Sequence, residues 1–75
     1  MDKHTFLSKL AEILDYDGVI TENQEVATID VWDSLGILSV LEFMSEMGVK
    51  IEPEDLYTIS NISQILELAN HKIDN

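Results

Sequence analysis

Three stretches of the chain repeat apolar residues at the spacing of an α-helix, and this periodicity restricts the fold more than any other feature. Residues three or four apart share one helix face, so each stretch predicts an amphipathic helix. The three stripes are Phe6, Leu7, Leu10, Ile13 and Leu14; Ile37, Val40, Leu41 and Met44; and Ile62, Ile65, Leu66, Ala69 and Ile73. No run alternates with the period of two that marks a strand. The sequence therefore predicts an all-α protein.

Residues that start or stop helices fall between these stripes. Pro53, with acids after it, begins a short third helix. Asn61 and Gln64 have the spacing of a capping box. The first helix is expected to start at Asp2 or Thr5 and to end near residues 15–18. The second is expected to start at Asp33 or Ser34 and to end at Gly48. We expect one domain, residues 1–75, folded as a small four-helix bundle with three main helices and one short helix.

The segment between the first two helices, residues 16–32, keeps neither helical nor strand periodicity. It predicts a long loop with one short helical turn. Its aliphatic residues are expected to hold it against the core; they are Val19, Ile20, Val26, Ile29 and Val31. Connections this long are unusual in a small domain and are usually functional.

Charge narrows the possible partners. Fifteen Asp and Glu against four Lys and no Arg give a net charge of −11, which excludes binding to nucleic acid or to an anionic bilayer by bulk charge. The absence of cysteine excludes disulfides and thiolate chemistry. No secretory signal and no spanning segment is visible. We expect a soluble, cytoplasmic protein, monomeric and not inserted in a membrane.

Ser34 is the residue with the most chemical interest. Asp33-Ser34-Leu35-Gly36 contains the Ser-x-Gly half of a nucleophile elbow, but Trp32 replaces the preceding glycine and the chain is too short for a hydrolase sheet. His4 and His71 fit no metal-ligand pattern. We therefore predict no catalytic residue, no metal site and no enzymatic activity.

The position of Ser34 suggests a different use. With Asp33 as the N-cap, its hydroxyl projects at the positive end of a helix, where an attached phosphate is stabilised. Leu35 is expected to anchor the first turn in the core. The alternative is that Ser34 only helps to start the helix.

Taken together, these features resemble the acyl carrier protein family. The resemblance rests on Asp33-Ser34-Leu35 at the start of the second helix, the long loop before it and the acidic composition. Gly48-Val49-Lys50-Ile51 follows that helix, and then come a short helix and a final one. The match runs from Phe6 to about Leu68.

The resemblance implies that Ser34 carries 4′-phosphopantetheine, transferred from coenzyme A by a separate phosphopantetheinyl transferase with a divalent metal. Asp33 would help to present Ser34 to that enzyme, and Leu35 corresponds to the family's anchoring leucine. The thiol of the arm would carry an acyl group as a thioester in fatty-acid, polyketide or related pathways. Gly36 replaces the acid common in fatty-acid carriers and also occurs in D-alanyl-type carriers, so an aminoacyl cargo is an alternative. An unmodified acidic adaptor for a basic protein is another.

Partner enzymes of such a carrier, acyl-transfer enzymes or ligases, are expected to present Lys and Arg to its acidic surface. The candidate contacts are Asp33, Leu35, Glu42 and Glu46 on the second helix, with Glu52, Glu54 and Asp55 near the third. Leu38 is either a partner contact or a core residue. Trp32 is predicted to be half-buried.

Self-repulsion at a net charge of −11 generates a prediction about stability. Millimolar Mg²⁺ or Ca²⁺ should raise the melting temperature more than a monovalent salt of equal ionic strength, because divalent ions bridge neighbouring carboxylates. Thermal unfolding followed by circular dichroism measures this. Equal effects of the two salts would mean that screening alone is at work.

Overall fold

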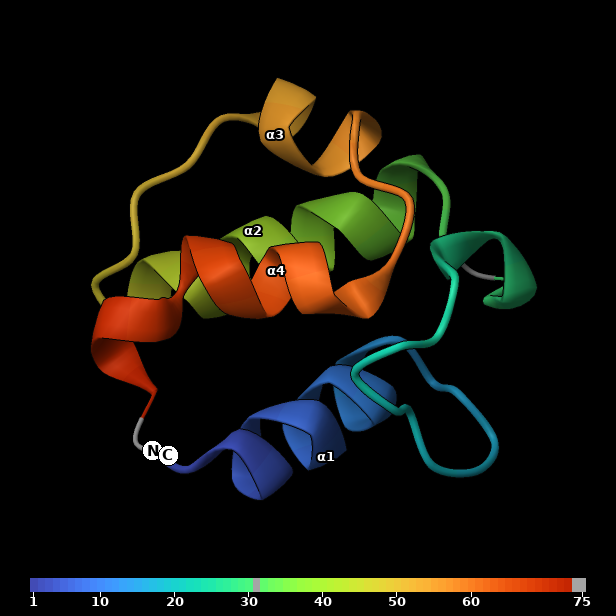
Figure 1. The fold of residues 1–75 in the computed structure, drawn as a ribbon. Coiled ribbons are helices and arrows are strands. Elements are labelled where there is room, and N and C mark those ends of the chain that lie inside the picture. The colour runs from blue at the N-terminus through green and yellow to red at the C-terminus, as the bar shows by residue number, and fades with distance from the viewer. Residues whose placement is uncertain (31, 74–75) are drawn as a thin grey trace.

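The computed structural model describes residues 1–30 and 32–73, and most of them are helical (Figure 1). The helices are α1 Lys3–Ile13, α2 Ser34–Glu46, α3 Pro53–Tyr57 and α4 Ile62–Leu68, with 3-10 turns at Val26–Thr28 and Asn70–Lys72. Glu25 and Asn61 form an isolated antiparallel β bridge. The helical architecture agrees with the predicted all-α class. None of the described helices has the length and apolar character needed to cross a membrane.

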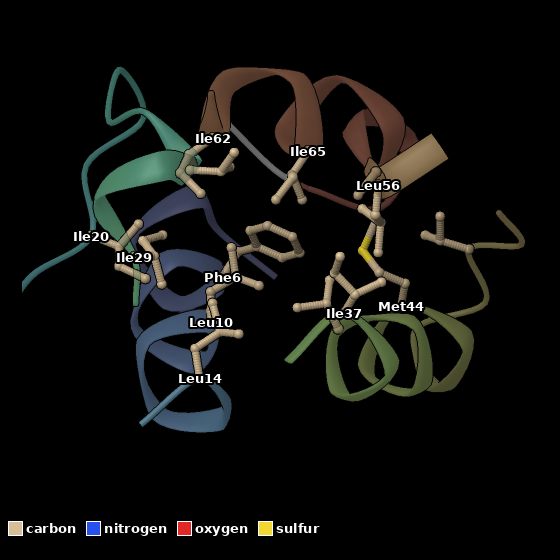
Figure 2. Close-up of a cluster of buried hydrophobic side chains, with 14 of the residues drawn as sticks. Phe6, Leu10, Leu14, Ile20, Ile29, Ile37, Met44, Leu56, Ile62 and Ile65 are labelled. Carbon is tan, nitrogen blue, oxygen red and sulfur yellow. The ribbon is translucent and has the colours of Figure 1, made fainter. Parts of the chain in front are cut away.

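One hydrophobic core joins all four helices to the first loop (Figure 2). Phe6 of α1 and Phe43 of α2 bring their rings to 5.4 Å between centroids, and α2 also packs against α3. The buried side chains of the described residues are all apolar; they are Phe6, Leu10, Leu14, Ile20, Val26, Ile29, Ile37, Val40, Met44, Val49, Leu56, Ile62, Ile65, Ala69 and Ile73. The predicted stripes therefore supply the core, with Leu7, Ile13, Leu41 and Leu66 at its margin.

The helix ends follow the predicted capping chemistry. The Thr5 amide donates to the Asp2 carboxylate at 2.7 Å, which caps α1 and lowers the pKa of Asp2. Gly48 ends α2 with a φ of +88°, a conformation that favours glycine. Gln64 accepts from the Asn61 amide at 3.0 Å in the predicted capping box of α4.

The loop carries the predicted helical turn, at Val26–Thr28, and buries Ile20, Val26 and Ile29. Val19, however, is 79% exposed, so the expectation that it pins the loop is wrong. Its neighbour Ile20 points into the core instead (Figure 2), and in extended chain adjacent side chains face opposite ways. Val31 lies outside the described residues.

Backbone hydrogen bonds attach this loop to α4. The Val26 amide donates to the Ser60 carbonyl at 3.0 Å, and the Ile62 amide donates to the Gln24 carbonyl at 2.9 Å. On the other side, Lys3 of α1 forms an ion pair with Glu22 at 3.0 Å. The loop is thus held between α1 and α4 before the chain enters α2.

The burial pattern predicts opposite outcomes for one substitution at two leucines. Leu56 is fully buried, so Leu56→Ala should cost about 2–5 kcal/mol, close to the whole stability of roughly 3–5 kcal/mol expected for a core this small. Leu35→Ala, at a residue 76% exposed, should change stability by less than about 0.5 kcal/mol. Urea unfolding measures both, and equal losses would contradict the assigned core.

Candidate functional site

The candidate site is the first turn of α2, which Asp33 caps. Asp33 has an extended backbone, and its Oδ1 accepts from the amides of Leu35 and Gly36, both at 3.1 Å. The Ile37 amide donates to the Asp33 carbonyl at 2.8 Å and begins the helical ladder. Ser34 is the first helical residue, and it is exposed. The predicted cap and the predicted exposure of Ser34 are both confirmed.

Apolar residues on both sides of the cap fix this turn. Trp32 precedes the cap and Ile37 occupies the fourth helical position, the two places where a hydrophobic staple forms. Ile37 is buried, and Trp32 is half-buried against the same core, as predicted. The chain therefore enters α2 with its direction set by packing on the side opposite Ser34.

Leu35 does not anchor the turn in the core, as the sequence had led us to expect. It is 76% exposed. The buried residues of α2 are Gly36, Ile37, Val40 and Met44, and successive helical residues are turned by about 100°. Leu35, two positions before Ile37, consequently faces solvent, and Trp32 and Ile37 anchor the turn instead.

The exposed face of α2 is apolar near Ser34 and acidic beyond it. The sequence left open whether Leu38 is a core residue or an exposed contact. Leu38 is 57% exposed, so it belongs to the surface. Glu42 and Glu46 are exposed further along the helix. We call Leu35, Leu38, Glu42 and Glu46 the α2 face.

The remaining predicted acids lie at the start of α3. Glu52 and Glu54 are exposed. Asp55 is partly buried, and its Oδ2 accepts from the Glu52 amide at 2.8 Å. Asp55 therefore serves first as a cap of α3, and only Glu52 and Glu54 extend the acidic surface freely.

Sequence reasoning missed one residue of structural importance in the first loop, Gln24. Its side chain accepts from the Thr21 amide at 3.2 Å and donates to Tyr16 Oη at 2.9 Å and Thr28 Oγ1 at 3.1 Å. The signal for the first contact was present, because Thr21 and Gln24 have the Thr-x-x-Gln spacing of a capping box. The bonds to Tyr16 and Thr28 follow from the folded loop.

Ser34 lies exposed at the start of α2, and neither histidine of the chain belongs to that helix. His4 and His71 belong to the end of the molecule where the termini lie, whereas α2 begins at the other end (Figure 1). The described residues contain no group of three or more potential metal-ligating His, Cys, Asp or Glu side chains. A surface hollow of about 530 Å³ is lined by α1 and residues 18–22 and includes no residue of α2. Ser34 is thus an exposed serine at the start of α2, apart from both histidines and from this hollow.

Comparisons of the chain with models of known protein families, with curated proteins and with solved structures find no match in any of the three.

The geometry of the cap predicts the effect of removing it. Asp33→Ala leaves the amides of Leu35 and Gly36 without the acceptor they use, and should cost about 0.5–2 kcal/mol. Asp33→Ser retains a capping oxygen and should recover most of that loss. Chemical unfolding measures both variants, with Asp30→Ala as the matched control at an exposed aspartate of the same loop. A loss as large in Asp30→Ala would show that charge, and not capping, is responsible.

Proposed function

We propose that this protein is an acyl carrier, folded as a four-helix bundle and covalently modified on Ser34 with 4′-phosphopantetheine. The arm ends in a thiol that holds an acyl group as a thioester, and the carrier presents this group to partner enzymes. The protein performs no chemistry itself. We place it in the cytoplasm, as a monomer.

The observation that carries the proposal is the exposure of Ser34 as the first residue of a 13-residue helix, directly after a capping aspartate. An attached phosphate would lie at the positive end of that helix, where negative charge is stabilised. The side chains that anchor the turn point into the core, so the modification would require no unfolding. The resemblance in residue order and helix order supports the same function.

The transfer reaction would balance as follows. The Ser34 hydroxyl oxygen attacks the pantetheine-bearing phosphorus of coenzyme A, and a phosphoester bond forms. The phosphoanhydride bond breaks, the adenosine bisphosphate half leaves, and a base on the transferase takes the serine proton. The divalent metal that neutralises the diphosphate belongs to the transferase and coenzyme A.

The α2 face is the proposed docking surface for the transferase and for acyl-transfer or ligase partners. Leu35 and Leu38 would fill an apolar recess beside the partner's active site, while Glu42 and Glu46 would meet Lys or Arg. Glu52 and Glu54 extend the charged area. Exposed ion pairs contribute only about 0–1 kcal/mol each, so they mainly speed and orient encounter. That is appropriate for a carrier that must dissociate after each delivery.

An unmodified adaptor is the second candidate, because an exposed face with two leucines and two acids suits a basic protein partner even without a prosthetic group. The two functions differ in whether Ser34 is ever modified. If it is modified, the native load on the arm decides between fatty acyl, polyketide and aminoacyl cargo, including the D-alanyl type.

Intact mass tests the proposed function. Incubation with coenzyme A, Mg²⁺ and a broad-specificity phosphopantetheinyl transferase should add one phosphopantetheine group to the wild-type protein and none to Ser34→Ala. Ser45→Ala, at another exposed serine of α2, should be modified like the wild type. A wild-type protein that stays unmodified with several transferases would favour the adaptor, and modification of Ser34→Ala would place the group elsewhere.

A further inference from the structure

We propose that Gln24 is the positioning residue of this site, because it locks the loop that holds Asp33 and Ser34 at the exposed start of α2. The inference rests on the modification of Ser34 proposed above. No hydrogen bond among the described residues joins Gln24 to Ser34 or Asp33, and it acts through the chain between them.

Gln24 joins four parts of the structure through five hydrogen bonds. Its side-chain amide donates to Tyr16 Oη just after α1 and to Thr28 Oγ1 in the 3-10 turn, and its side-chain oxygen accepts from the Thr21 amide. Its backbone amide donates to the Thr21 carbonyl at 3.2 Å, and its backbone carbonyl accepts from the Ile62 amide of α4 at 2.9 Å. Tyr16 is itself fixed, since its amide donates to the Ala11 carbonyl of α1 at 2.9 Å.

A series of turns leads from Gln24 to the site. The Thr28 amide and hydroxyl both donate to the Glu25 carbonyl, at 3.0 and 2.7 Å. The Ile29 amide then donates to the Val26 carbonyl, and the Trp32 amide to the Ile29 carbonyl, both at 3.0 Å. The next residue is the cap, Asp33. Gln24 fixes the position of Thr28 through a hydrogen bond. Because the following turns are each closed by a hydrogen bond, the position of the first turn of α2 depends on that of Thr28.

The packing of buried side chains does not by itself fix the conformation of the loop between Gln24 and α2. Val26 and Ile29 attach the loop to the core by packing, which is not directional. Hydrogen bonds specify orientation, and the bond from Gln24 to Tyr16 Oη is partly buried, where it is less exposed to competition from water. Without them the loop populates further conformations, and the fraction of molecules that present Ser34 correctly falls. An enzyme that binds only that fraction then has a proportionally weaker apparent affinity.

The test uses Gln24→Ala, with Asn23→Ala as a matched control at an exposed neighbouring amide residue. Amide exchange by NMR should become roughly five- to tenfold faster at Ile29 and Trp32 in Gln24→Ala. The amides of Leu35 and Gly36, which report the Asp33 cap, should follow in the same direction. Exchange at the fully buried α1 residues Phe6 and Leu10 should not change. Tyr16→Phe removes one of the five bonds and keeps the ring, so it should give a smaller change at the same amides.

A second arm measures transfer of phosphopantetheine from coenzyme A to each variant. KM for the carrier should rise about three- to tenfold in Gln24→Ala with kcat unchanged, because only the competent fraction is altered. Unaltered exchange at Ile29 and Trp32 would overturn the role of Gln24, and so would faster exchange with an unchanged KM. A wild-type protein that no transferase modifies would refute the proposed function. It would also refute the role of Gln24 in presenting Ser34 to a transferase. The exchange data would then show only whether Gln24 orders the loop.

Discussion

The structure depends on the burial of apolar surface in a core that four helices cannot close alone. Three of the four helices are amphipathic and one has only five residues, so Ile20, Val26 and Ile29 of the first loop complete the enclosure. In a chain of 75 residues every such contact is a large fraction of the stability. The loop is therefore part of the fold, and its path determines how the chain enters α2 and where Ser34 stands.

The charged side chains of the described residues lie outside this core. Every buried side chain among the described residues is apolar, and the acids lie outside. Lys3 and Glu22 form an ion pair in which both side chains are nearly half exposed. Charged side chains therefore contribute little to the packing that holds the described residues together. On α2 this gives a helix whose inner face is buried in the core and whose outer face exposes Leu35, Leu38, Glu42 and Glu46.

Much of this arrangement could be predicted from the sequence, since local rules govern it. Helical periodicity identified the core stripes, and the candidate capping residues included the N-caps observed for three helices, Asp2, Asp33 and Asn61. Two expectations were wrong. Leu35 was expected to anchor the turn in the core, although the spacing of Ile37, Val40 and Met44 turns it outward, and Val19 was grouped with the buried loop aliphatics although it faces solvent beside the buried Ile20. The contacts of Gln24 with α4 depend on tertiary folding, which no spacing in the sequence encodes.

Trp32 gives the site a built-in optical reporter. It is the only tryptophan in the chain, it is half-buried, and it stands two residues before Ser34. Its indole fluorescence therefore arises from one place, next to the first turn of α2. Changes in emission wavelength or quenching would follow events at that turn in real time, with no dye attached and no second indole to subtract.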